Sequence, residues 1–294
     1  MRSLLSSVPM AIEHNWLIGA GVSAPLDMAL PAIPEQLVAR HSDDAGLAAN
    51  IGRRGIRFKD RATRLALVSA RRAMEAAGLV ASGYSDLDDR RCAIVVASRF
   101  GNVDTVLRCA AQLRAGGAAS LSPMDLPNAS ANVIPSTLAI WFGLRGPNLL
   151  VAGGRDCGLQ ALKTSLVLLD SHQADRVLVC GVEAGQPELE PLFLSAAAGE
   201  TAPVDVSAAL VLERAADVPG AGWALARARD GRAPSAPAVV RPGSGQPPLM
   251  LGQSDAPGPY HGAHGASGVL EAIARTRCDL ETSASARGLA GVLP

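Results

Sequence analysis

Three short apolar runs constrain the fold of this chain more than any other feature of its sequence. They are residues 92–97 (CAIVVA), 176–181 (RVLVCG) and 208–213 (AALVLE). Apolar residues follow one another in these runs instead of alternating with polar ones, which is typical of strands buried on both faces. The sequence therefore predicts a sheet that is covered by helices on both sides.

Helices are predicted between and around these strands. Their apolar residues recur at helical spacing over residues 61–77, 102–115, 132–142, 158–170 and 265–275. Glycines follow several of these segments and would end them. Strands that alternate with helices in this way indicate an α/β layered fold.

The remaining segments have weaker patterns. Residues 12–25 are interpreted as a strand followed by a Gly-rich turn, and residues 31–55 as irregular with a short helical patch. Pro, Gly and Ser dominate residues 231–259, which predicts a loop-rich connection. Residues 288–293 are expected to return as a final strand.

The composition excludes several classes of function. Lys and Arg number 27 and Asp and Glu also 27, so the net charge is +0 and nothing attracts nucleic acid or an anionic membrane. Hydrophobic residues make up 48% of the chain but aromatic residues only 3%, so we expect a core of Ala, Val, Leu and Ile. A neutral, apolar surface favours association with a partner.

The five cysteines are scattered and form neither a CxxC pair nor a Cys/His cluster. We therefore predict no metal site, no cofactor and no disulfide framework. The N-terminus has no long apolar stretch before Glu13 and His14, and no later segment is long enough to span a bilayer. These features predict a cytoplasmic protein without a signal peptide.

Residues 146–162 (GPNLLVAGGRDCGLQAL) have the pattern of a nucleophile elbow. A short strand at 148–152 ends in the turn Gly153-Gly154-Arg155, and a helix follows. The residue in such a turn lies at a helix N-terminus, where backbone N–H groups and the helix dipole favour a thiolate or an oxyanion.

Together with this elbow, three further motifs occur in order: residues 126–128 (LPN), 142–148 (FGLRGPN) and 181–184 (GVEA). With them the chain resembles the β-ketoacyl synthase family, most strongly over residues 61–213. The resemblance implies a thiolase-like layered αβαβα fold with a shortened C-terminal half. It divides the chain into a ketosynthase-like half at 1–213 and a reduced half at 214–294, which includes the Pro/Gly-rich connection.

The chain departs from this family at the catalytic residues. The family's cysteine aligns with Arg155, and an arginine cannot attack a thioester because it stays protonated. The family's His-Gly-Thr sequence is absent. Its second histidine aligns with Gly262, next to His261 and His264 and before the recognisable helix start at 265–268 (GASG).

The resemblance is closest to the chain-length-factor subunit of a type II polyketide synthase, and the short C-terminal half suits a polyene-forming, highly reducing system. It implies a chain that is not catalytic alone. Such a subunit forms a heterodimer with an active ketosynthase, acts on acyl carrier protein through that complex, and shapes the tunnel during decarboxylative Claisen condensation.

The same resemblance implies two groups of site residues. The tunnel or chain-length gate would consist of Val103, Asp104, Val106, Leu107 and Ala110. The subunit interface would include Leu126, Pro127, Asn128, Trp141, Phe142 and Arg155. Two interpretations remain open for the first group, because its apolar members also fit an ordinary core and Asp104 also fits a helix cap.

Two alternative functions remain open from the sequence. The first is an independent acyltransferase or decarboxylase of the thiolase fold that uses Asp156, Cys157 and His261. Cys157 lies two residues beyond the elbow position, about 200° around the helix, so we expect it to point into the sheet. The second is a degenerate homodimeric protein that has no ketosynthase partner.

Overall fold

A nine-stranded mixed sheet forms the centre of the computed structural model. The structure describes residues 14–52, 55–56, 58–80, 89–185, 202–214, 223–227, 237–240, 249–251, 260 and 263–276. The strands are β1 (His14–Pro25), β2 (Val38–His41), β3 (Cys92–Ser98), β4 (Asn148–Ala152), β5 (Arg176–Glu183), β6 (Val206–Arg214), β7 (Ala224–Arg227), β8 (Pro237–Val240) and β9 (Leu249–Met250).

The strand order is β4-β3-β5-β6-β1-β7-β8-β9, with β2 beside the end of β1. The three strands β4, β3 and β5 run parallel to one another, whereas β6 is antiparallel to both β5 and β1. Parallel neighbours need a crossover connection, and helices supply it here.

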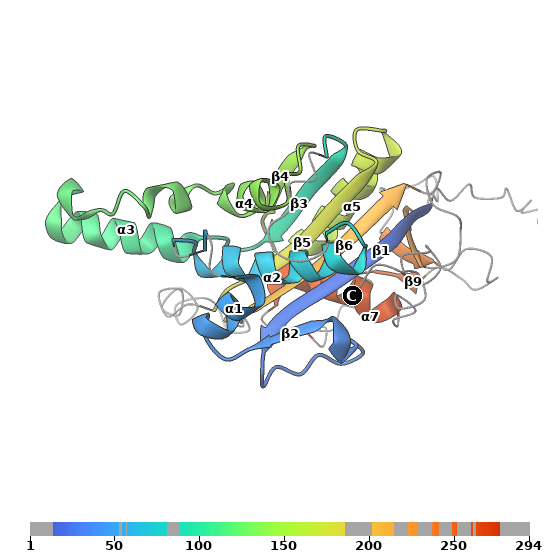
Figure 1. The fold of residues 1–294 in the computed structure, drawn as a ribbon, viewed down its shortest axis with the longest axis horizontal. Helices are drawn as coiled ribbons and strands as arrows, with labels where there is room; N and C mark the ends of the chain where they lie inside the picture. Colours follow the sequence, from blue (N-terminus) through green and yellow to red (C-terminus); the bar gives the residue numbers. More distant parts are fainter. Residues whose placement is uncertain are drawn as a thin grey trace, which may run out of the picture.

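Helices cover both faces of this sheet (Figure 1). The α-helices are α1 (Asp44–Ile51), α2 (Arg61–Ala76), α3 (Val103–Gly116), α4 (Val133–Phe142), α5 (Cys157–Asp170) and α7 (His264–Thr276), and the 3-10 helices are η1 (Glu35–Leu37), η2 (Ala118–Ser120) and η3 (Leu126–Ala129). Helices α1, α2 and α4 share one apolar core with one face of the sheet, and α5 and α7 share a second core with the other face.

The apolar runs are buried on both sides, as predicted. In β3, Ala93, Val95 and Ala97 pack toward α5 and α7, while Ile94 and Val96 pack toward α2 and α4. Every residue of β3 is buried. The layered α/β fold expected from these runs is therefore confirmed.

Two local predictions in the N-terminal region were wrong. The segment interpreted as a strand plus a Gly-rich turn is one continuous strand, β1. Its Gly19 and Gly21 let α2 approach closely, since a Cβ at these positions would lie 2.1 Å from the Ala73 oxygen and 2.5 Å from the Ser69 oxygen. The region expected to be irregular apart from a short helical patch has that patch as α1, but it also contains the strand β2.

The C-terminal predictions have mixed outcomes. The last helix is present as α7. Strands β8 and β9 lie within the segment interpreted as loop-rich, and apart from Leu251 the rest of that segment lies outside the described residues. The final strand predicted at 288–293 is also outside them.

Four glycines bring α5, α7 and β5 into backbone contact. A Cβ on Gly158 or on Gly181 would lie 2.5 Å from the Gly265 oxygen, and one on Gly268 would lie 2.7 Å from the Leu159 nitrogen. Real Cβ atoms do not approach backbone atoms so closely, so these helices can take their positions only without side chains there.

We expect Gly181→Ala to lower the free energy of unfolding by about 1–3 kcal/mol, because the new methyl group would press against the backbone of α7. Urea denaturation measures this change. Gly153→Ala is the matched control, since nothing lies within 4 Å of a Cβ at that position. Equal stability of the two variants would contradict the close contact.

Candidate functional site

The carboxyl ends of the parallel strands β3, β4 and β5 meet at one edge of the sheet. Residues 99–102, 153–156 and 184–185 follow these ends. Ligands of α/β sheets bind at this edge, outside the carboxyl ends of the strands. The candidate site is therefore built from these three connections and from the helices that follow them.

The elbow has the predicted strand–turn–helix geometry. Strand β4 ends at Ala152, a turn covers residues 153–156, and α5 begins at Cys157. Arg155 lies in this turn with an exposed side chain. The Asp156 carboxylate accepts a hydrogen bond of 2.8 Å from Gln160 of the same helix. The turn thus presents a permanently protonated guanidinium where an elbow presents its nucleophile.

Cys157 is not available as a substitute nucleophile. Its exposed fraction is 2%, and it belongs to the core shared by α5 and α7. Burial raises the pKa of its thiol to about 12, and the charges of Glu183 and Asp156 act in the same direction. Because the thiolate is the reactive form, this thiol is inert at neutral pH. The expectation that Cys157 points into the core is confirmed.

Glu183 is a buried carboxyl group at the same end of the strands, and sequence reasoning used it only as part of the motif at 181–184. It ends β5, and burial raises its pKa to about 7 although four donors contact it. The donors are the backbone N–H groups of Arg99, Phe100 and Gly265 and the hydroxyl of Ser98.

Of the region directly before α7, the structure describes Tyr260 and Ala263. His261 and Gly262 are outside the described residues. Tyr260 is 7% exposed and donates a 2.7 Å hydrogen bond to the Pro31 carbonyl. Burial raises its pKa to about 12. Tyr260 therefore ties this region to the connection after β1.

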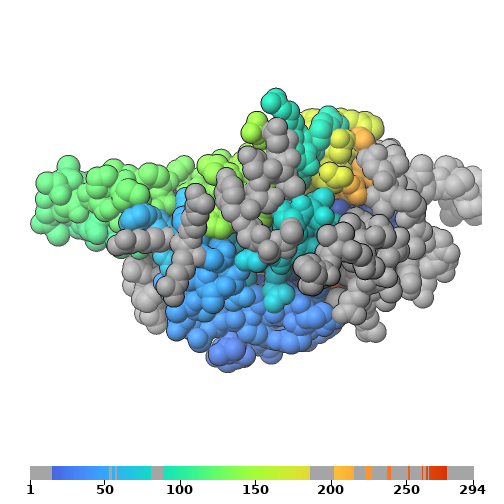
Figure 2. Space-filling view, viewed as in Figure 1, coloured from blue at the N-terminus to red at the C-terminus, as the bar shows by residue number. Residues whose placement is uncertain are grey.

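Helix α3 projects from the body of the molecule (Figures 1 and 2). We define its inner side as Asp104, Thr105 and Arg108 and its outer side as Val103, Val106, Leu107 and Ala110. Asp104 and Thr105 are the buried residues of α3. Val106 is 43% exposed, and the other three outer residues are partly exposed. The outer side is therefore no part of the core that the described residues form.

The predicted interface residues divide into exposed and buried groups. Leu126, Pro127 and Arg155 are exposed. Asn128 is buried and donates hydrogen bonds to the carbonyls of Phe58 and Met124.

Trp141 and Phe142, which were also predicted to lie at the interface, are buried within this chain. They are 8% and 0% exposed and pack in the core with α2. Thr137 and Leu138 lie one helical turn before Trp141 and Phe142 and are also buried, so these residues form the inward side of α4. Ile140 lies on the outward side and is 72% exposed.

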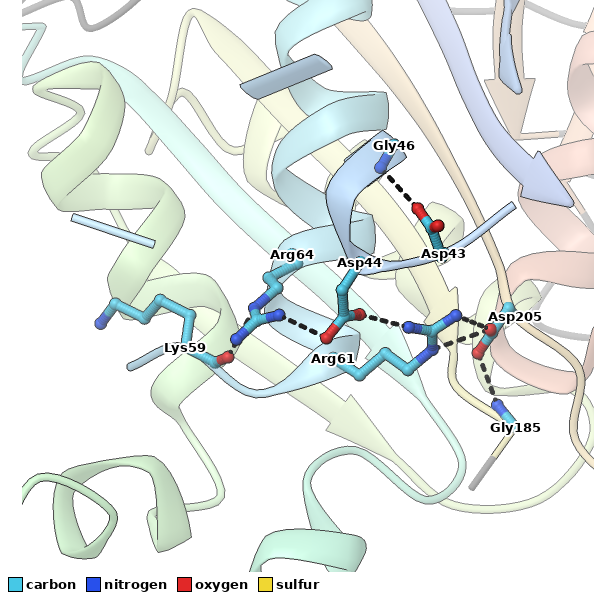
Figure 3. A network of polar contacts seen from close by, with 8 residues as sticks. All are labelled: Asp43, Asp44, Gly46, Lys59, Arg61, Arg64, Gly185 and Asp205. Atoms are coloured by element: carbon cyan, nitrogen blue, oxygen red, sulfur yellow. Dashed lines mark hydrogen bonds and ion pairs between the residues drawn. The ribbon is translucent and has the colours of Figure 1, made fainter. Parts of the chain in front are cut away.

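A charged pocket of about 390 Å³ lies beside the inner side of α3. Figure 3 shows Arg61 of α2 between Asp44 of α1 and Asp205 before β6, while Arg64 donates to Asp44 at 2.8 Å. Asp104 and Arg108 of α3 also line the pocket. These walls suit polar groups and not an acyl chain, because an apolar ligand would desolvate ion pairs. The sequence did not predict this pocket, which joins distant segments.

Two general expectations can be compared with the described part of the chain. Within it, no group of three or more His, Cys, Asp or Glu side chains is arranged to hold a metal ion. Among the helices of that part, none combines the length and the apolar character needed to cross a bilayer.

Comparison with known proteins gives a family and a fold. Residues 37–211 match the model of the β-ketoacyl synthase N-terminal domain. A curated relative, 3-oxoacyl-[acyl-carrier-protein] synthase 2 of Coxiella burnetii (strain RSA 493 / Nine Mile phase I), is 24% identical over 159 residues. This match covers 54% of the chain and 37% of the relative, so the chain spans well under half of that protein.

Two solved structures are similar. The ishigamide ketosynthase/chain length factor has a TM-score of 0.58 and 22% identity, covering 72% of this chain and 65% of its own. A type II polyketide synthase acyl-carrier protein in complex with its ketosynthase bound to the hexaketide has a TM-score of 0.53 and 15% identity, covering 70% and 63%. The chain therefore has the mixed α/β thiolase-like fold of ketosynthases.

We expect iodoacetamide near neutral pH to alkylate Cys109, which is half-buried on α3, at least about tenfold faster than Cys157. Peptide mass spectrometry measures both rates. Cys157 should react readily only after unfolding in urea. Comparable rates for the two thiols in the folded protein would mean that Cys157 is accessible and would revive it as a nucleophile.

Proposed function

We propose that this chain, which belongs to the β-ketoacyl synthase family, is a chain-length-factor subunit without condensing activity of its own. It would pair with an active ketosynthase and form part of the tunnel that receives the growing polyketide during decarboxylative Claisen condensation on acyl carrier protein. The observation that carries this proposal is the elbow, where Arg155 occupies the turn and Cys157 is buried behind it.

The similar structures support the proposal at the level of fold. One is a ketosynthase/chain length factor, and the other holds an acyl-carrier protein with its ketosynthase. In such a pair, the subunit without a nucleophile can contribute only shape and contacts. A loss of reactive groups with retention of the fold is the pattern expected of that subunit.

Exposed apolar side chains support a partner on one part of the surface. Six of the nine exposed large hydrophobic residues of the described part lie in the stretch of sequence from α3 to β4: Val106, Leu113, Met124, Leu126, Ile140 and Leu149. Phe58 lies beside this segment, because its carbonyl accepts a hydrogen bond from Asn128, and of the nine only Leu26 and Val167 lie elsewhere. A concentration of exposed apolar residues marks a surface that a second protein covers.

The position of β4 gives a second reason to expect a partner there. This strand is one edge of the sheet and pairs only with β3 in the described part. Leu149, in its middle, is 38% exposed. An edge strand with an apolar side chain can pair with another chain and otherwise invites aggregation. We therefore infer that the interface includes β4, α4 and α3.

The proposal is tested by reconstitution. The isolated chain, given acyl- and malonyl-loaded carrier protein, should form no condensed product. Addition of a cognate ketosynthase with an intact cysteine should give product and should also protect this chain against thermal unfolding. Turnover by the isolated chain, retained in Cys157→Ala, would contradict a non-catalytic subunit.

We expect Ile140→Asp to weaken the heterodimer at least about tenfold in Kd, because it places a charge in an apolar contact without disturbing the core. Analytical ultracentrifugation or calorimetry measures the affinity. Leu26→Asp is the matched control, since Leu26 is 66% exposed at the far end of β1, compared with 72% for Ile140. If both variants bind as tightly as the wild type, α4 is outside the interface.

We expect Val106→Trp and Ala110→Phe to shorten the product by one or more extender units, because the added bulk would fill the space beside the outer side of α3. Product analysis by mass spectrometry of the reconstituted complex measures the length. Ala115→Trp adds similar bulk at an exposed position toward the other side of the helix and should leave the length unchanged. Unchanged products from both outer-side variants in assembled complexes would remove α3 from the tunnel.

A further inference from the structure

One buried carboxyl group joins three segments at the base of α3. Oε1 of Glu183 accepts hydrogen bonds from the backbone N–H groups of Arg99 and Gly265 and from the Ser98 hydroxyl, the last two at 3.2 and 3.3 Å. Oε2 accepts from the Phe100 N–H at 3.4 Å. The end of β5, the corner between β3 and α3, and the start of α7 therefore share one side chain.

These segments are packed closely around the carboxylate. A Cβ on Gly265 would lie 2.8 Å from Oε1 of Glu183 and 2.8 Å from Cα of Ser98. The hydroxyl of Ser98, which contacts Glu183, also accepts a 2.7 Å hydrogen bond from the Gly101 N–H. The corner from Ser98 to Gly101 is thus held by hydrogen bonds to Glu183 and Ser98 and by the close approach of Gly265.

The orientation of α3 depends strongly on this corner, because within the described part of the chain the helix is buried only in its first turn. Only Asp104 and Thr105, in its first turn, are buried. Asn102 braces the other side of the corner by donating to the carbonyls of Asn128 and Ser130. With about 1.5 Å of rise per residue the helix is about 20 Å long, so a rotation of about 10° at its base would move its tip by about 4 Å.

We propose that Glu183 is a positioning residue for α3: it fixes the angle at which the helix leaves the sheet and couples that angle to the starts of α5 and α7. The inference rests on the proposed function in one respect, since the outer side of α3 is there the wall of the tunnel. Glu183 would then determine chain length without touching the chain.

The burial of the Glu183 carboxyl group is consistent with a role in positioning α3. Burial raises the pKa of Glu183 to about 7, so the site holds its carboxyl group at a cost in desolvation. A buried polar group that contacts several backbone donors fixes one arrangement of the segments around it, because any other arrangement leaves donors unsatisfied.

Hydrogen–deuterium exchange on the isolated chain tests the inference without a partner. We expect Glu183→Ala, and to a smaller degree Glu183→Gln, to speed exchange across α3 by about tenfold relative to the amides of β3 and β5, which corresponds to about 1.4 kcal/mol of local opening. The glutamine variant keeps the size of the side chain and decides the question if the alanine variant fails to fold.

Glu213→Gln is the matched control. Glu213 is also buried, at 6% exposure, but it lies at the opposite end of the β5–β6 pair and accepts from Arg176. Glu213→Gln should lower the free energy of unfolding, but the ratio of the exchange rates of α3 to those of β3 and β5 should stay the same. An α3 whose relative exchange is unchanged in both Glu183 variants would overturn the inference.

The reconstituted heterodimer supplies the functional readout. Glu183→Gln should broaden the distribution of product lengths while the amount of assembled complex stays at the wild-type level. An unchanged distribution despite a loosened α3 would overturn the link to chain length. If the wild-type chain binds no ketosynthase, the proposed function fails, whereas a loosened α3 in the exchange experiment would still support Glu183 as the residue that positions it.

Discussion

Direct backbone contact between two helices and a strand determines the geometry of the site. The starts of α5 and α7 approach each other and β5 through Gly158, Gly181, Gly265 and Gly268, with no side chain between them. Because neither helix can move away without opening a gap or move closer without a clash, the first turn of α5 has one position over the sheet. The exposed turn with Arg155, the burial of Cys157 and the reach of Glu183 to Gly265 all follow from that position.

Helix α3 departs from the usual arrangement of an amphipathic helix. Such a helix buries its apolar side against its own core and exposes charge. Here Asp104 is buried beside the charged pocket, while Val106 is 43% exposed. The free energy available from burying the apolar outer side, about 25 cal/mol per Å², is therefore not gained within the described part of the chain. That free energy remains available for association.

Local patterns predicted most helices and strands because burial imposes them residue by residue. The apolar run of β3 and the helical spacing of α2 are examples. Predictions failed where a distant contact gives a residue its role. Gly19 and Gly21 predicted a turn, but they lie within a strand, where the close approach of α2 leaves no space for a side chain. Ile140 was missed although the spacing of α4 placed it opposite Trp141 and Phe142, and Glu183 contacts a helix start 82 residues later in the sequence.

Because the inner and outer sides of α3 differ in polarity, we infer that a tunnel along this helix is formed by two chains. The inner side faces a pocket in which Arg61 is paired with Asp44 and Asp205, and an acyl chain placed there would strip water from those charges. An apolar chain can therefore lie only along the outer side. That side has no opposing wall in the described part of the chain, because its residues are exposed or partly exposed. Under the proposed function a second protein supplies the wall, and the same contact buries Leu126 and Ile140. Under the proposed function, assembly and tunnel formation are then one event, and a change that loosens α3 alters both the interface and the space left for the product.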